Sequence, residues 1–196
     1  LEEHYHSVGR YNAKVETIVN PLPNNRAEIK IQVTENDVAL LKDVTFVGNQ
    51  AFDSDRLQDQ MELQPDAWWK FFGNKFDSTQ FTKDLETIRN YYLDRGYAKA
   101  GIANTDVKLN DEKTEARVTI DIVEGEKYTV NGARIVGDVG GMAEKLAPLL
   151  KQIHVGEAFR RSDVQLVEES IKATLGERGY GSAQVNVQPD FNDENK

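Results

Sequence analysis

The feature that most constrains the fold is a repeat of short motifs along the chain. The stretch "VTFVGN" at residues 44–49 returns as "ARIVGD" at 133–138, so its Val-Gly pair recurs after 89 residues. The stretch "GNKF" at 73–76 returns as "GEAF" at 156–159, after 83 residues. Motifs that recur in the same order indicate repeated structural modules, because each module solves the same small folding problem.

A helix is predicted after each GxxF motif. Apolar residues there recur at steps of three and four, which places them on one face of a helix, and a Gly-Tyr pair follows in both copies. The two apolar sets are Phe81, Leu85, Ile88 and Tyr92 in the first copy, and Val164, Val167, Ile171 and Leu175 in the second.

The ends of these two helices carry recognisable signals. The first is predicted to begin near Asp77 or Ser78, since either residue is an acceptable N-cap. The second is predicted to begin at Ser162, which has the spacing of a capping box with Gln165. Both are predicted to end at a glycine, which adopts the left-handed C′ conformation at little cost.

Strand patterns complete each module. The clearest is "EARVTIDIV" at 115–123, whose apolar residues alternate with polar ones as in a strand buried on one face. Further strands are predicted at 133–138 and 182–189, and the polar turns "PLPNNR" and "NDEKTE" join strand pairs into hairpins. With another helix at 54–61 and at 142–153, the module order is β-α-α-β-β. The predicted fold class is therefore α+β, in tandem modules that each pack a three-stranded mixed sheet on two helices.

Parts of three modules are predicted. Leu1, Tyr5 and Gly9 repeat the end of a module helix, so residues 1–36 are assigned to the C-terminal part of one module. Residues 37–126 are assigned to a complete module. Residues 127–196 are assigned to a module without its last strand, because the sequence stops at "DFNDENK".

One strand of the middle module breaks the period of two. Its apolar positions change from even to odd numbers along the strand: Ala98, Ala100, Ile102, Val107 and Leu109. Both sets face the core only if one extra residue is accommodated, so a β-bulge is predicted within residues 103–106. The alternative is a strand that simply begins later, near Thr105. Bulges concentrate at sheet edges and near functional sites, which makes this strand the candidate site.

Composition argues against several function classes. The formal net charge is −9, which disfavours a nucleic-acid binder, and there are no cysteines for disulfides, thiolate metal sites or nucleophiles. His4 and His6 stand about 200° apart around a helix, so they diverge rather than converge on a metal. No catalytic or phosphate-binding motif is present. We therefore expect a non-enzyme without cofactor or metal; the alternative, a small α+β hydrolase, would need titratable residues that converge in a cleft.

The stretch "PDAWWKFF" at 65–72 has two interpretations. Trp68 and Trp69 could form an exposed aromatic patch for a partner or a membrane interface. The alternative is that these rings cap the end of a small core, where large side chains contribute much of the burial.

Four stretches of the chain resemble a known family. "FVGNQAF", "DLETIRNYYLDRGYAKA", "VTIDIVEGEKY" and "LGERGYGSAQVNVQP" resemble the POTRA (polypeptide-transport-associated) domains of the outer-membrane β-barrel assembly machinery of Gram-negative bacteria. The similarity extends along essentially the whole chain and is closest in the middle module. It implies that the pieces are the end of a second POTRA domain, all of a third and most of a fourth.

The resemblance implies a periplasmic, non-enzymatic platform at the outer membrane, with membrane contact only through a C-terminal barrel absent from this chain. Such domains receive unfolded outer-membrane β-barrel proteins and dock accessory lipoproteins, here a BamB-like lipoprotein near the middle module. The expected mode is β-augmentation, in which an extended chain pairs with a free strand edge. A related secretion or translocation transporter (TamA-like or two-partner secretion) and a passive spacer are the alternatives. The residues expected to bind partners are Ala103, Asn104, Thr105, Asp106, Val107, Lys108 and Leu109.

Overall fold

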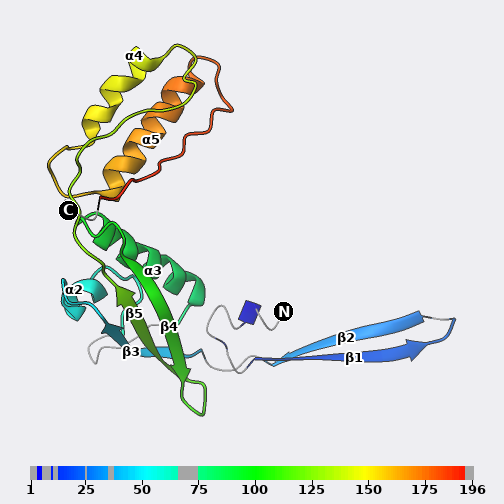
Figure 1. Cartoon of the computed structure of the whole chain (residues 1–196). Helices are drawn as coiled ribbons and strands as arrows, with labels where there is room; N and C mark the ends of the chain where they lie inside the picture. The colour runs from blue at the N-terminus through cyan, green and yellow to red at the C-terminus, as the bar shows by residue number, and fades with distance from the viewer. Residues whose placement is uncertain are drawn as a thin grey trace. The chain divides into compact units, whose positions relative to one another are not determined.

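The computed structural model describes residues 4–5, 10, 13–24, 26–34, 38–65 and 75–192 (Figure 1). The chain forms two compact units, Leu1–Ile88 with Ile102–Val123, and Arg89–Gly101 with Glu124–Lys196. In chain order the elements are β1 (Lys14–Leu22), β2 (Arg26–Thr34), β3 (Leu40–Val47), α2 (Ser54–Gln58), α3 (Ser78–Leu93), β4 (Gly101–Leu109), β5 (Glu115–Val123), α4 (Ala143–Leu146), the 3₁₀ helix η1 (Ala147–Gln152) and α5 (Arg161–Gly176).

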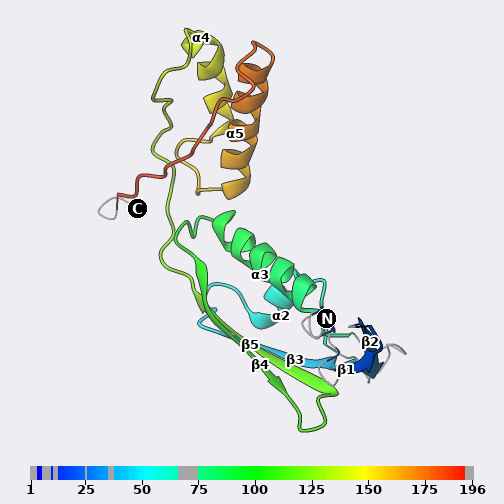
Figure 2. The ribbon, with the colours of Figure 1, turned by 90° about the vertical axis from the view of Figure 1, so that its right-hand side faces the viewer.

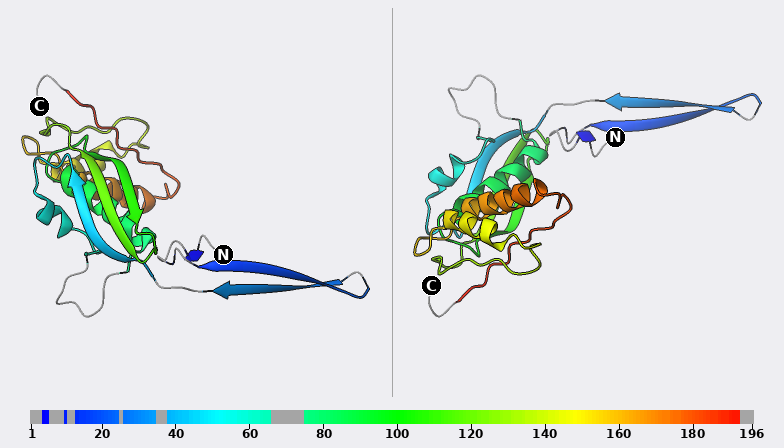
Figure 3. Two further views of the ribbon diagram at one scale, coloured as in Figure 1. Left: turned by 90° about the horizontal axis from the view of Figure 1, so that it is seen from below. Right: turned by 90° about the horizontal axis from the view of Figure 1, so that it is seen from above.

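Strands β1 and β2 form the hairpin that the "PLPNNR" turn predicts. They pair antiparallel over their whole length, with Val19 opposite Ile29 (Figure 3). Partners in an antiparallel pair share a face, so most apolar residues of the two strands line one side of the ribbon, while Ile18 and Leu22 lie on the other side, opposite Lys30 and Arg26. Most of these side chains are exposed within the described residues.

Strands β3, β5 and β4 form a mixed sheet in that order, which confirms the predicted fold class. β3 runs parallel to β5, with Val44 opposite Val118 and Phe46 opposite Ile120. β4 and β5 run in opposite directions, as a hairpin requires (Figure 1). The last strand of the module, β5, is therefore the central one, and β4 is an outer strand.

The core of the first unit lies on one face of this sheet, on the side of α2 and α3 (Figure 2). Val118 and Ile120 are at most 1% exposed, which confirms the alternation predicted for β5. Leu57 of α2 and Ile88 of α3 are fully buried as well. Full burial of an aliphatic side chain stabilises the fold by about 1.5–3 kcal/mol, so this layer supplies much of the stability of a small unit.

Both ends of α3 agree with the sequence prediction. The Asp77 carboxylate accepts hydrogen bonds from the backbone N–H groups of Thr79 (2.8 Å) and Gln80 (2.9 Å), as an N-cap does. At the other end Gly96 has φ +96°, and the Tyr97 N–H donates to the Tyr92 carbonyl at 3.2 Å. This is a Schellman motif, which explains why glycine precedes tyrosine here.

In the second unit, the same Gly-Tyr corner ends α5. Gly179 has φ +90°, and the Tyr180 N–H donates to the Leu175 carbonyl at 3.0 Å. The helix predicted at 142–153 is divided into α4 and the 3₁₀ turn η1, which begins next to a proline. Its apolar side chains pack with those of α5 in one cluster: Met142, Leu146, Val167, Ile171 and Leu175.

The prediction of strands at 133–138 and 182–189 is wrong, because neither stretch pairs with another strand among the described residues. Neither stretch is a strand among the described residues, although Ile135, Ala183 and Val185 still pack on the α5 cluster. The sheet order of the first unit gives the reason. There the two outer strands pair only through the central β5, and the described part of the second unit holds no strand in that position. Two outer strands without a central partner have no ladder to join.

Candidate functional site

The candidate site is the outer edge of β4, formed by residues 103–109. β5 pairs with one side of β4, and no strand in the described part of the chain pairs with the other. The opposite outer strand, β3, differs because its start is covered: Leu40 bridges Lys75, and the Phe76 N–H donates to the Ala39 carbonyl at 2.8 Å. All seven residues predicted to bind partners therefore lie on an outer strand with a long open edge.

Burial along β4 does not alternate. Ala100, just before the strand, is 5% exposed and Ile102 is half-buried, whereas Ala103 and Asn104 are exposed. Thr105 and Leu109, which have the opposite parity, are half-buried, while Val107 is 37% exposed.

A change of parity along the strand is what an inserted residue produces, and the bulge within 103–106 stays a prediction. A register irregularity of this sheet lies between Leu41 and Asp43, in the pairing of β3 with β5. The second candidate, the aromatic patch at Trp68 and Trp69, lies outside the described residues.

The turn after β4 is built by Asn110. Its backbone N–H donates to the Glu115 carbonyl at 3.1 Å, and its side-chain oxygen accepts the N–H groups of Thr114 (2.8 Å) and Glu115 (3.0 Å). Lys113 has φ +53° within this turn. The asparagine thereby closes the hairpin and fixes which residues of β4 and β5 stand opposite each other.

A small pocket lies where the hairpin closes. It has a volume of about 170 Å³ and is lined by Lys108, Leu109, Asn110, Glu115 and Arg117, which we call the hairpin-end pocket. The contribution of Asn110, Glu115 and Arg117 was not predicted from the sequence. The available signal was Asn110 at the head of a polar turn, since asparagine side chains commonly bond the backbone of a turn.

Within the described residues, some of the charged side chains around this pocket form ion pairs and one does not. The Lys108 ammonium lies 3.2 Å from the Asp106 carboxylate, and the Glu115 carboxylate lies 3.9 Å from the Lys42 ammonium. Among the residues that the structure describes, the exposed Arg117 guanidinium forms neither a hydrogen bond nor an ion pair. All of these groups are at least partly exposed, so each pair contributes little to stability by itself.

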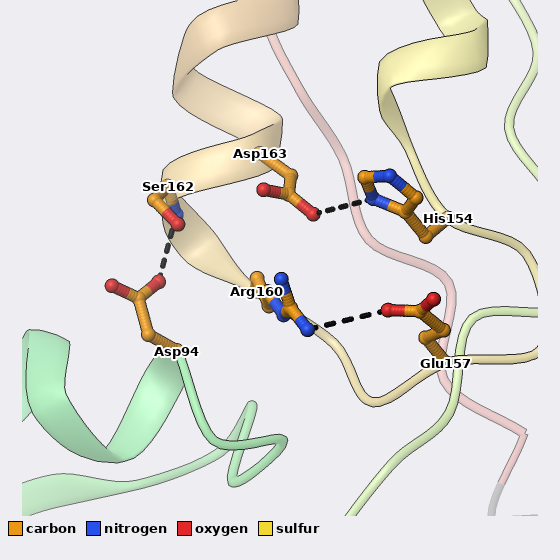
Figure 4. Close-up of polar contacts among 6 residues, drawn as sticks. All are labelled: Asp94, His154, Glu157, Arg160, Ser162 and Asp163. Atoms are coloured by element: carbon orange, nitrogen blue, oxygen red, sulfur yellow. Dashed lines mark hydrogen bonds and ion pairs between the residues drawn. The ribbon is translucent and has the colours of Figure 1, made fainter.

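A second polar cluster lies wholly within the second unit (Figure 4). The Asp94 carboxylate, in the turn after α3, accepts the backbone N–H of Ser162 at 2.8 Å. The capping box predicted for Ser162 and Gln165 is wrong, because α5 begins at Arg161 and its N-cap Arg160 makes no side-chain cap bond. A carboxylate 68 residues earlier in the chain satisfies this N–H instead.

The remaining contacts of this cluster are one hydrogen bond of His154 and one ion pair of Arg160, both exposed. The His154 Nδ1 atom lies 3.2 Å from the Asp163 carboxylate, and the Arg160 guanidinium lies 3.2 Å from the Glu157 carboxylate. In the described ranges, no three His, Asp or Glu side chains gather in a way that could hold a metal ion. Nor does any described helix have the length and apolarity to cross a membrane.

One titratable group of the second unit is strongly perturbed. Tyr92 is 1% exposed, and its hydroxyl donates to the Glu124 carboxylate at 2.8 Å. Burial, reinforced by that carboxylate, raises the pKa of Tyr92 well above its ordinary value of 10.0. The group is held neutral as a hydrogen-bond donor, which is a structural role.

Comparison with known proteins gives consistent results. The POTRA family model, described as a surface antigen variable number repeat, matches residues 39–125 and 128–196. The outer membrane protein assembly factor BamA of Neisseria meningitidis is 29% identical over 100% of this chain and 25% of its own length. BamA of Buchnera aphidicola is 25% identical over 100% of this chain and 32% of its own length. The chain thus spans about a quarter to a third of these curated relatives.

A solved structure is more similar still. The crystal structure of Haemophilus influenzae BamA POTRA3-5 has a TM-score of 0.72 and 59% sequence identity. The match covers 81% of this chain and 62% of that one. The family resemblance inferred from the four sequence stretches is therefore confirmed. The chain belongs to the POTRA family, and its two matched stretches are POTRA domains of the kind found in BamA.

Proposed function

We propose that this chain is part of a non-catalytic, periplasmic platform that serves outer-membrane protein assembly. The names of its relatives support this proposal, because they are outer membrane protein assembly factors. Those relatives are BamA proteins, which favours this assignment over a secretion or translocation transporter. On this proposal the partners are unfolded outer-membrane proteins and an accessory lipoprotein of the BamB type.

The observation that carries the proposal is the open edge of β4. An outer strand presents backbone N–H and C=O groups that have no partner within the sheet, and an extended chain can pair with them. Main-chain hydrogen bonds do not depend on side-chain identity, so one edge suits clients of varied sequence. A lipoprotein strand would use the same edge.

The position of Asn110 indicates which groups point outward. Its N–H is directed toward β5, where it donates to Glu115. Because these directions alternate along a strand, we expect the N–H and C=O groups of Leu109 and Val107 to point away from β5. Val107 is thus the residue at which a proline removes an outward donor and leaves the β5 ladder intact.

The experiment is an amide NMR titration of this chain with a peptide from an outer-membrane β-strand. We expect shifts concentrated at residues 103–109, lost in Val107→Pro and kept in Val107→Ala, which retains the N–H. Slow hydrogen exchange of the β5 amides in both variants establishes that the sheet is intact. Shifts that persist unchanged in Val107→Pro, or no shifts at high peptide excess, would contradict strand capture at this edge and leave a passive spacer.

A further inference from the structure

We propose that the ion pair of Asp106 and Lys108 sets the direction and register of the strand added at the β4 edge. The inference rests on the proposed function and specifies the partner. The added strand runs antiparallel to β4 and carries the pattern acid-x-base, such as Glu-x-Lys. Its acidic residue stands opposite Lys108 and its basic residue opposite Asp106.

The first step is the position of these two side chains. They are two residues apart on β4, and the 3.2 Å contact between the Lys108 ammonium and the Asp106 carboxylate places them on the same face. Their side chains are 78% and 48% exposed, respectively. Both charges are therefore accessible beside the open edge of the strand.

The second step is the charge of the residues that stand beside Lys108 and Asp106 on the neighbouring strands, β5 and β3. Asn110 stands opposite Glu115, so counting back by two along each strand places Lys108 opposite Arg117. The same count places Asp106 opposite Thr119. On the far side of β5, Asp43 is the partner of Arg117 and Thr45 is the partner of Thr119.

Across the sheet these residues form two rows that end at the open edge. The first row carries an acidic residue, then two basic ones, Arg117 and Lys108, which are like charges on directly opposed residues. Such a pair is unfavourable in a sheet, and a carboxylate next in the row would interact with both cations. Both basic side chains also line the hairpin-end pocket, together with Glu115. The second row carries two threonines and then Asp106, so a base is the favourable next residue.

The third step concerns strand direction. An antiparallel neighbour meets Lys108 before Asp106 as it runs from its N-terminus, so the matching order is acid-x-base. A parallel neighbour would need base-x-acid. Antiparallel pairing is slightly more stable per residue, and it is the direction that we assign.

The test compares two strand peptides of identical composition, ten residues of alternating valine and threonine with Glu-x-Lys or Lys-x-Glu at the centre. Two favourable cross-strand pairs in place of two unfavourable ones predict a Kd about 5- to 10-fold lower for Glu-x-Lys. The ratio should shrink as salt is added. An uncharged Gln-x-Gln peptide measures binding by the backbone alone.

The matched variant exchanges the two charges, Asp106→Lys with Lys108→Asp. This variant keeps the net charge and the local ion pair, so it should reverse the preference to Lys-x-Glu. Substitution of an unrelated cation, Arg134→Gln, should leave the preference for Glu-x-Lys unchanged. Equal affinity for both charged peptides while Gln-x-Gln still binds, or a preference for Lys-x-Glu in the unaltered chain, overturns this inference alone. Failure of all three peptides to bind overturns the proposed edge and the inference with it.

Discussion

Substitution of the repeated Val-Gly glycine should have very different costs in the two copies of the motif. Gly48 follows β3 with φ +86°, and a Cβ atom added there would lie 2.2 Å from the Ile122 carbonyl oxygen of β5. Alanine in the left-handed region costs about 1–2 kcal/mol. The backbone must also move to relieve the contact, which adds about 1–3 kcal/mol by analogy with overpacked cores. Gly48→Ala should therefore destabilise the first unit by about 2–5 kcal/mol.

Gly137 is the matched control, because it is the same residue of the repeated motif. Its φ is +105°, and a Cβ atom there would meet nothing within 4 Å. Gly137→Ala should therefore carry only the conformational cost of about 1–2 kcal/mol. The difference between the two substitutions isolates the close approach of β3 to the backbone of β5.

Native-state amide hydrogen exchange is the suitable assay, because it reports each unit separately. Ile120 of β5 reports on the first unit and Ile171 of α5 on the second. Since each 1.4 kcal/mol is a factor of ten, exchange at Ile120 should accelerate about 30- to 4,000-fold in Gly48→Ala. Exchange at Ile171 in Gly137→Ala should accelerate about 5- to 30-fold. Equal effects of the two substitutions would refute the steric argument.

Three further substitutions test single contacts. Asp94→Ala should weaken the start of α5 by about 1 kcal/mol, seen as faster exchange of the Ser162 amide, and unchanged exchange would contradict the cap. The raised pKa of Tyr92 means that its stabilising effect is complete below the ordinary value of 10.0 and is lost as pH rises above it. Tyr92→Phe should flatten this alkaline loss in urea unfolding, and an identical pH profile would contradict the assignment. Asp84→Ala removes the buried acceptor of the two N–H groups at 62–63, which should cost about 1–3 kcal/mol in urea unfolding, whereas no change would show that water replaces it.

The features of the fold that could be predicted are local ones. The Asp77 cap involves residues two and three positions away, and the corner at Gly96 is closed by the adjacent Tyr97. Both can therefore be predicted from the local sequence. The alternation of buried and exposed residues along β5 could be predicted for the same reason. Helix and strand periods record which side of an element is buried, without any knowledge of what covers it.

Contacts between distant residues could not be predicted in this way. Ser162 and Gln165 have the spacing of a capping box. The Ser162 N–H nevertheless donates to the Asp94 carboxylate, which is distant in the sequence. The stretch at 133–138 has a strand composition, yet a strand needs a partner that composition does not supply. Arg117 is one polar residue of an alternating strand, and its place beside Lys108 follows only from the hairpin register that Asn110 sets.

The central position of β5 also bears on how such a module folds as its chain emerges. During synthesis the N-terminal parts appear first, and β3 is complete long before β5. Because β3 bonds β5 and not β4, no ladder of this sheet can close until the last nine-residue strand has been made. The contact order is correspondingly high, and the backbone edge of β3 that pairs with β5 stays unpaired in the meantime. This module is thus vulnerable to misfolding until β5 has been made, and β5 then completes the whole sheet at once.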